Sequence, residues 1–298
     1  MIDFINAYTE IKESLENRIK NDFLDNETKC TLNYSTGEIV YPCKRRFENI
    51  EVRITNTKAI IKNSIHTYFN LKQGIAIGNY TDFSYSDVIS SIQQLEKDVN
   101  ENILDFKVTN LEFGFNIQTS LDAKSILENN FVMYNFDEFS QIDTFKGKGY
   151  YKQYNRNQYY VKLYDKALQF QLPCNLLRTE IKIKDSKLLK KFGIFTVKDI
   201  YRKECLYQLF SFFLQCFEQI NIVDSFSTHE ISGDEKKLIE LGKSPHYWRG
   251  IKQRYSSSSS YYDKIEEYNL LLEKFGLDSL KKELRGLLVN KFEQLIEG

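Results

Sequence analysis

The 298-residue sequence contains little proline and glycine, with 3 Pro and 13 Gly. These low counts exclude a collagen-like chain and a chain dominated by linkers. The sequence also lacks any run of 18 apolar residues, so we expect no transmembrane helix and no membrane partner. Its first residues, Met1–Phe4, do not place a charged segment before an apolar stretch, and we therefore expect no signal peptide.

Cysteine is scarce and does not form a recognisable pattern. The five cysteines are odd in number, and none belongs to a CxxC pair, which removes the sequence support for a zinc ribbon or thioredoxin-type chemistry. They are Cys30, Cys43, Cys174, Cys205 and Cys216. Because scattered cysteines without a disulfide framework are typical of a reducing compartment, we predict a cytoplasmic protein.

The sequence has no excess of charge of either sign. Lys and Arg number 41, Asp and Glu also number 41, and the formal net charge is +0, which excludes a uniformly basic coat for nucleic acid. Hydrophobic residues make up 42% and charged residues 28%, as in an ordinary folded protein. The aromatic content of 14% favours stacking surfaces, although codons rich in A and T explain it equally well.

The pattern of turns and of apolar residues predicts an α+β fold with an antiparallel sheet, flanking helices and a helical C-terminal region. Predicted strands lie at 31–34, 39–41, 52–55, 59–61, 107–117, 158–164 and 176–184. Predicted helices lie at 84–99, 122–130, 185–191, 197–220, 235–241, 244–254, 261–275 and 277–296, and we expect Ser84 to cap the first of them. We therefore divide the chain into a mixed domain at 1–195 and an all-helical domain at 196–298, with a flexible turn at the serine run 256–260.

Positive charge is concentrated between Lys146 and Lys191. This stretch contains twelve Lys and Arg residues and three acids, a local charge of +9, interleaved with six tyrosines. Cations neutralise phosphates and aromatic faces stack on bases, so the stretch is typical of a groove for single-stranded DNA or RNA. A solvated basic face with tyrosines at strand ends is the alternative. The candidate nucleic-acid contacts in this stretch are Lys148, Lys152, Tyr159 and Tyr160.

Three predicted strands carry a small set of reactive groups. Glu112 lies among apolar neighbours, Lys162 and Tyr164 share one face of a strand, and the next strand aligns Arg178, Glu180 and Lys182 on one face. Buried carboxylates are rare unless paired or bound to a metal. Glu112 and Glu180 are therefore candidate ligands for Mg²⁺ or Mn²⁺, both of which prefer oxygen donors. A salt bridge to a nearby Lys or Arg is the alternative for each acid taken alone.

Tyr164 is the candidate nucleophile of this set. A phenol with a pKa near 10 is a poor nucleophile at neutral pH, and we expect the flanking Lys162 and Lys166 to favour its phenolate. A divalent ion would polarise the phosphate under attack. Tyr159 and Tyr160 are competing nucleophiles, and any of the three tyrosines could instead serve packing.

The order of these segments resembles the replication initiators of phages and plasmids typified by the filamentous-phage gene II/X proteins. The resemblance covers roughly residues 50–220. The matching segments are Ser64–Asn70, Gly78–Ser84, Leu111–Ile117, Tyr160–Lys166, Leu177–Ile183 and Leu189–Ile194. Each segment is weakly diagnostic by itself, and their common order gives the resemblance its specificity.

The resemblance implies a rolling-circle initiator, an enzyme that nicks one strand at an origin, holds the 5′ phosphate on a tyrosine and later rejoins the strand. Tyr164 would then be the nucleophile and Glu112 and Glu180 the metal ligands. Lys162 and Lys166 would activate the tyrosine or hold the scissile phosphate, and Arg178 and Lys182 would contact DNA. Implied partners are a single-stranded or cruciform DNA origin and a host helicase and polymerase.

His66 is the only histidine in the predicted N-terminal domain. It is a candidate third metal ligand or proton shuttle, with Asn70 and Asn79 as candidate DNA contacts. The better-known nicking enzymes carry two histidines around one hydrophobic residue, and that pair is absent here. A lone histidine at a strand end, satisfied by its surroundings, is the alternative.

The C-terminal region offers a second candidate for DNA contact. Ser244–Arg254 is basic and aromatic and follows a predicted helix, which indicates a helix–turn–helix that could contact duplex through Arg249 and Lys252. A surface for homodimerisation is equally compatible. For the whole chain, the alternative to an endonuclease is a non-catalytic nucleic-acid-binding protein acting in replication control or on RNA.

Overall fold

A computed structural model of the chain describes residues 1–21, 28–75, 77–144, 150–225, 231, 233–254 and 258–298. Its main feature is a ten-stranded sheet in the order β2-β3-β4-β5-β1-β6-β11-β10-β9-β8, in which every neighbouring pair is antiparallel. The strands are β1 (Ile2–Thr9), β2 (Thr28–Leu32), β3 (Ile39–Phe47), β4 (Ile50–Ile54), β5 (Ala59–Ser64), β6 (Lys107–Gln118), β8 (Gln141–Thr144), β9 (Tyr150–Asn155), β10 (Tyr159–Asp165) and β11 (Leu176–Ile183). The N-terminal strand β1 therefore lies in the interior of the sheet, between β5 and β6.

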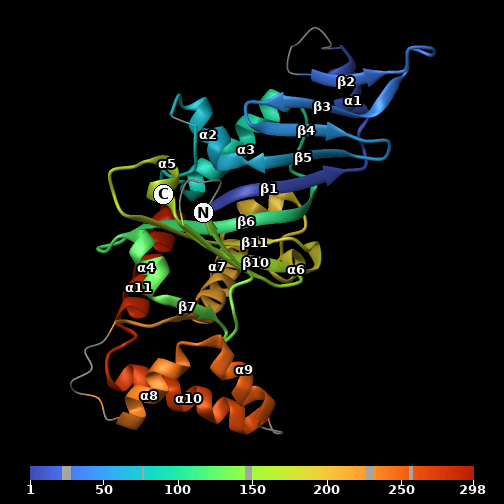
Figure 1. Cartoon of the computed structure of the whole chain (residues 1–298). Coiled ribbons are helices and arrows are strands. Elements are labelled where there is room, and N and C mark those ends of the chain that lie inside the picture. The colour runs from blue at the N-terminus through green and yellow to red at the C-terminus, as the bar shows by residue number, and fades with distance from the viewer. Residues whose placement is uncertain (22–27, 76, 145–149, 226–230, 232, 255–257) are drawn as a thin grey trace.

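Most helices lie where the sequence pattern predicts them, whereas those at 13–21, 65–72 and 166–170 lie where no helix was predicted. The helices are α1 (Glu13–Asn21), α2 (Ile65–Lys72), α3 (Tyr85–Val99), α4 (Ala123–Asn129), α5 (Lys166–Phe170), α6 (Ser186–Lys191), the 3₁₀ helix η2 (Val197–Tyr201), α7 (Lys203–Glu218), α8 (Gly233–Gly242), α9 (Pro245–Arg254), α10 (Ser258–Lys274) and α11 (Ser279–Glu297). Ser84 caps α3 as expected, in a capping box with Asp87. Figure 1 shows β2–β5 at one end of the molecule and α8–α10 at the other.

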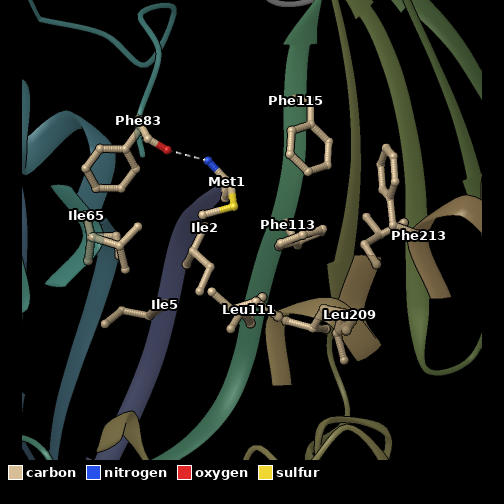
Figure 2. Close-up of a cluster of buried hydrophobic side chains, with 14 of the residues drawn as sticks. Met1, Ile2, Ile5, Ile65, Phe83, Leu111, Phe113, Phe115, Leu209 and Phe213 are labelled. Carbon is tan, nitrogen blue, oxygen red and sulfur yellow. Dashed lines mark hydrogen bonds between the residues drawn. The ribbon is translucent and has the colours of Figure 1, made fainter. Parts of the chain in front are cut away.

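One face of the sheet carries the hydrophobic core. Phe113 and Phe115 of β6 project from this face because strand residues alternate between faces, and both rings meet Phe213 of α7 with centroids 6.0 and 5.2 Å away. Phe115 also contacts Phe292 of α11 at 6.2 Å. Figure 2 shows this cluster continuing across β1 to Ile65.

These observations confirm the α+β class. The hydrophobic core does not divide at residue 196, because buried residues of α7 and α11 belong to the same cluster as the sheet. A second, smaller cluster gathers around Trp248 and Tyr268 of the C-terminal helices, with Met133 from β7 (Phe131–Tyr134). The division into domains at 195/196 stays a prediction.

Several local predictions were wrong. The region after 196 is not entirely helical, since β12 (Ile220–Ile222) pairs with β7. Strand β9 lies in the basic stretch where no strand was predicted before residue 158, and it pairs with both β8 and β10. The predicted turn at 256–260 lies partly outside the described residues, and Ser258 already begins α10. No helix among the described residues is both long enough and apolar enough to cross a membrane.

Candidate active site

The strand register brings the predicted reactive residues to one face of the sheet. Lys162 of β10 pairs with Glu180 of β11, and Tyr164 pairs with Arg178. On the other side of β11, Lys182 pairs with Glu112 of β6. All of these side chains point away from the hydrophobic core, because the residues between them, such as Leu163 and Ile181, belong to it.

Three carboxylates meet on this polar face. Asp3, Glu112 and Glu180 each offer an oxygen, and the three oxygens lie within 4.8 Å of one another. Asp3 comes from β1 and accepts hydrogen bonds from Ser64 and Asn79. The predicted pair of glutamates is thus brought together and joined by a third acid that the sequence analysis missed.

The carboxylates are already paired with cations. The Lys162 ammonium donates to Glu112 at 3.0 Å and to Glu180 at 2.9 Å, and Lys182 lies 2.9 Å from Glu112. Arg178 donates through Nε to Glu180 at 3.0 Å and through a terminal nitrogen to Asp3 at 3.2 Å. Both alternatives in the sequence analysis are therefore present at once, since the acids converge and each is salt-bridged.

These charges set the protonation of Glu180. Burial alone raises the pKa of this carboxyl group, but the charges of Lys162 and Arg178 outweigh burial and hold the pKa well below its usual value. The pKa of Lys162 is raised, because Glu180 and Glu112 outweigh the opposing effect of its burial. The pair is therefore fully ionised at neutral pH.

Tyr164 faces the acidic group but is not a phenolate. Its hydroxyl donates to Glu180 Oε2 at 3.3 Å, and the residue is 6% exposed. Burial and the charge of Glu180 raise the pKa of the Tyr164 phenol well above its usual value, against a smaller effect of Arg178. The expectation that flanking lysines favour the phenolate was wrong, because Lys162 is held by the two glutamates.

Lys166 reaches the site through the turn that ends β10. The Asp165 carboxylate accepts the backbone N–H of Leu168 at 2.8 Å and caps α5, so the chain turns immediately after Tyr164. The buried Lys166 ammonium donates to Asn79 and lies 5.2 Å from the centre of the Tyr164 ring. Burial, followed by the charge of Arg178, lowers the pKa of Lys166 to about 7.

Gly114 makes room for this arrangement. It pairs with Glu180, and a Cβ at Gly114 would lie 2.4 Å from the Thr179 carbonyl oxygen and 2.5 Å from the Cβ of Glu180. Neither backbone can retreat without disturbing the β6–β11 ladder. The absence of a side chain at this position is therefore what allows the close approach of β11 where it carries Glu180.

His66 does not belong to the carboxylate group. It lies in α2 rather than at a strand end, its Nε2 is bonded to Thr81 Oγ1 at 2.9 Å, and its ring stacks on Phe83 with centroids 4.5 Å apart. Burial and then nearby positive charges, including that of Arg178, lower the pKa of His66 well below its usual value. The imidazole is therefore neutral and satisfied, which argues against its predicted role as a ligand.

Two of the predicted DNA contacts have structural roles instead. Asn70 is fully buried and donates to the Gly78 carbonyl at 2.9 Å and to Thr81 at 3.0 Å, so it holds the loop before α3. Arg178 is also buried, and its remaining terminal nitrogen donates to Asn116 at 3.2 Å. A phosphate contact by Arg178 would require it to release one of these partners.

The tyrosine doublet is split by the alternation of β10. Tyr160 lies on the same face as Tyr164 and pairs with Lys182, whereas Tyr159 packs on the other face against Phe212 at 5.2 Å. Lys152 is buried on the core side of β9 and donates to the Phe131 carbonyl at 2.5 Å. Tyr159 and Lys152 are thus not positioned as predicted.

The remaining predicted contacts are dispersed. Lys148 lies outside the described residues. Arg249 and Lys252 lie on α9, where Arg249 is within 3.8 Å of Asp137 and 3.6 Å of Glu138. The neighbouring Trp248 is buried and donates to the Gly242 carbonyl at 2.8 Å, so part of the predicted helix–turn–helix serves the second core cluster.

The sequence analysis did not identify Asp3 and Asn116 as site residues, and the sequence pattern around them indicates such a role only weakly. Asp3 is a lone acid in the apolar run Ile2–Ile5, the same kind of signal that singled out Glu112. The sequence does not show that β1 lies beside β6, and that adjacency is what places Asp3 next to Glu112.

The acidic group offers the kind of donor atoms that a divalent metal ion prefers. Three carboxylates with oxygens within 4.8 Å suit Mg²⁺ or Mn²⁺ in chemical type. Lys162 bridges two of these acids, so a metal ion bound between Glu112 and Glu180 would displace its ammonium. The residues therefore fit the ion, on condition that Lys162 moves.

The similarity of this chain to known proteins is distant. No family model matches the chain, and no curated protein matches it. Among solved structures, the rolling circle replication initiator protein from Geobacillus stearothermophilus is similar with a TM-score of 0.41 and 11% identity, over 77% of this chain and 88% of that chain. A likeness this distant assigns neither a family nor an activity to the chain.

Proposed function

We propose that the protein is a DNA nicking and joining enzyme that initiates rolling-circle replication, with Tyr164 as its nucleophile. The observation that carries the proposal is the hydrogen bond from the Tyr164 phenol to Glu180 within a group of three carboxylates. A phenol, a proton acceptor, neighbouring cations and hard oxygen ligands are the parts that phosphoryl transfer to tyrosine requires.

The proposed step is an in-line displacement at phosphorus. The Tyr164 oxygen forms a bond to the phosphorus of one DNA strand, and the bond from that phosphorus to the 3′ oxygen breaks. The phenolic proton passes to Glu180 Oε2, the atom to which it is already hydrogen-bonded. The departing 3′ oxygen takes up a proton from water and leaves as a hydroxyl group, and attack by such a hydroxyl reverses the step and rejoins the strand.

Lys162 couples substrate binding to this proton transfer. Its charge is the largest of those that hold the pKa of Glu180 down, so Glu180 is a weak proton acceptor while Lys162 remains in place. When the Lys162 ammonium turns toward a phosphate, the pKa of Glu180 rises and its basicity improves. Lys166, with a pKa lowered to about 7, then lies beside the Tyr164 ring as a second cation for the phosphate.

A divalent ion would be held by Asp3, Glu112 and Glu180. When bound it would stabilise negative charge on the phosphate oxygens. The experiment incubates the protein with Mn²⁺ and a labelled single-stranded oligonucleotide drawn from a library of replication origins, and it detects a covalent adduct on a denaturing gel. We expect an adduct with the wild type, none with Tyr164→Phe, and none with Glu180→Gln.

Tyr160→Phe is the matched control, because Tyr160 lies on the same face four residues away and is half-buried. This variant should form the adduct at the wild-type rate. An adduct that survives Tyr164→Phe would assign the nucleophile to another residue. Thermal melting of each variant shows whether a lost adduct reflects chemistry or unfolding.

A non-catalytic nucleic-acid-binding role is the second candidate. It is favoured by the burial of Tyr164 and by the pairing of all three carboxylates with Lys162, Lys182 or Arg178. An enzyme must open this arrangement before DNA can reach the phenol, whereas a binding protein need not. Tight DNA binding without any adduct, with Mg²⁺ or Mn²⁺ present, would establish this second role.

A further inference from the structure

The polar face that carries the candidate active site continues across the other half of the sheet. The register defines one row of directly paired residues that crosses six strands from β2 to β6. In order, the row is Lys29, Lys44, Arg53, Ile60, Tyr8 and Lys107. We call these six residues the basic row. It contains four cations, one tyrosine and no acid, and with strands about 4.8 Å apart it spans roughly 24 Å.

The basic row is open to solvent. Lys29 and Lys107 are exposed, and the other four residues are half-buried, while their strand neighbours such as Val52 and Ile61 are buried on the core side. The nearest acids make weak pairs, because Lys44 lies 3.9 Å from Glu51 and the ion pair of Lys107 with Glu10 is exposed. A polyanion could therefore replace them.

Arg53 adds an unmet donor. Its Nε is shielded from solvent and has no hydrogen-bond partner among the described residues. The guanidinium would have to turn outward for a phosphate oxygen to reach this Nε, and it would then present several N–H donors in a planar fork.

Lysine ammonium groups lie over aromatic rings on the same face. Tyr8 has Lys58 at 5.0 Å and Lys107 at 5.6 Å from its ring centre, and Lys182, beside Glu112, lies 4.5 Å from the ring of Phe4. Bases stack on such rings and phosphates bind such lysines, which is the usual composition of a surface for single strands. Phe4 lies along β1 between Tyr8 and Asp3, so the cationic and aromatic groups lead toward the carboxylates.

We propose that the basic row binds single-stranded DNA beside the nicking site, holding a segment of the strand whose scissile phosphate lies at Tyr164. This inference rests on the proposed function for the place of the scissile phosphate, and the basic row itself is assigned from charge and register alone. The half-buried tyrosine on this surface favours a single strand, since stacking needs unpaired bases.

The test measures binding of mixed-sequence single-stranded DNA by fluorescence anisotropy, with EDTA present and at several salt concentrations. One variant replaces Lys29, Lys44, Arg53 and Lys107 by Gln. The control variant replaces four lysines of the C-terminal helices, Lys236, Lys237, Lys274 and Lys282, by Gln, so its charge change is the same.

We expect the first variant to bind at least tenfold more weakly. The negative slope of log K against log salt should become shallower by about 3, since each of the four lost phosphate contacts contributes about 0.7. The control variant should bind like the wild type. Equal affinity of the two variants, or a loss confined to double-stranded DNA, would overturn the inference.

The stacking component is tested separately at Tyr8. Tyr8→Phe should keep the wild-type affinity, whereas Tyr8→Leu should weaken binding severalfold, and equal binding by both variants would remove stacking from the inference. The adduct assay keeps the two proposals apart. If the wild type forms the adduct and the four-site variant binds DNA as tightly as the wild type, only the proposed role of the basic row is wrong. If binding depends on the basic row and no adduct forms, only the proposed nicking activity is wrong.

Discussion

The Lys162 ammonium lies between two carboxylates, 3.0 Å from an oxygen of Glu112 and 2.9 Å from an oxygen of Glu180. It thereby neutralises the two acids that the sequence marks as metal ligands. The Lys162 ammonium and a divalent ion would compete for the position between Glu112 and Glu180. The position of the Lys162 side chain therefore decides whether the site can bind a metal ion.

Replacing Lys162 by Met should increase the affinity for Mn²⁺ by tenfold or more. The substitution keeps an unbranched side chain one atom shorter and removes the competing charge, which leaves Glu112 and Glu180 to repel each other until a cation binds. Isothermal titration calorimetry with Mn²⁺ measures the effect, and Lys282→Met, on the exposed side of α11, serves as the control. An unchanged affinity in Lys162→Met would mean that no metal occupies this place.

Lys166 should give the stability a distinct pH dependence. Its pKa is lowered to about 7 in the folded protein, from 10.5 when unfolded, so between these values the unfolded chain holds the extra proton. Stability from this group therefore rises with pH between about 7 and 10.5, and the full cost of burying its charge is felt below pH 7.

Lys166→Met removes this dependence. We expect the variant to gain on the order of 1–3 kcal/mol relative to the wild type at pH 6, and to lose that advantage as the pH approaches 10. Urea denaturation at a series of pH values measures the difference. A difference that stays constant with pH would show that the Lys166 ammonium is not buried as a charge.

Gly114→Ala should destabilise the protein by about 2–3 kcal/mol or more, because the added Cβ would collide with the backbone of Thr179 and with Glu180. Gly286→Ala is the matched control. Gly286 lies in α11 with nothing within 4 Å of an added Cβ, so this change should be neutral or stabilise by up to about 1 kcal/mol. Equilibrium unfolding in urea compares the two, and similar free energies of unfolding would contradict the close approach of β6 and β11.

A fragment ending at residue 195 should not fold by itself. It would lack Phe213 and Phe292, which cover Phe113 and Phe115, and it would expose this apolar face of the sheet. We expect aggregation or the loss of near-ultraviolet circular dichroism, whereas the full chain gives one cooperative transition through this core. A fragment with a cooperative melt would support the division of the chain at 195/196.

Much of the site could be predicted from local pattern. Glu112, Tyr164, Arg178 and Glu180 stand out as polar residues in strands with apolar alternation, and their shared face follows from the period of two along each strand. The same rule separates Tyr160 from Tyr159. His66 was misplaced because its segment is equally compatible with the end of a strand and the first turn of a helix.

The sequence by itself determined which side of each strand is apolar and which residue types are available for chemistry, because both depend on neighbours one or two positions away. Only the tertiary structure decided that β1 lies between β5 and β6, which adds Asp3 to the acidic group and Tyr8 to the basic row. It also decided that Lys162, not solvent, faces Glu112 and Glu180. Strand order and register are set by the packing of the entire core, and no local stretch of the chain contains that information.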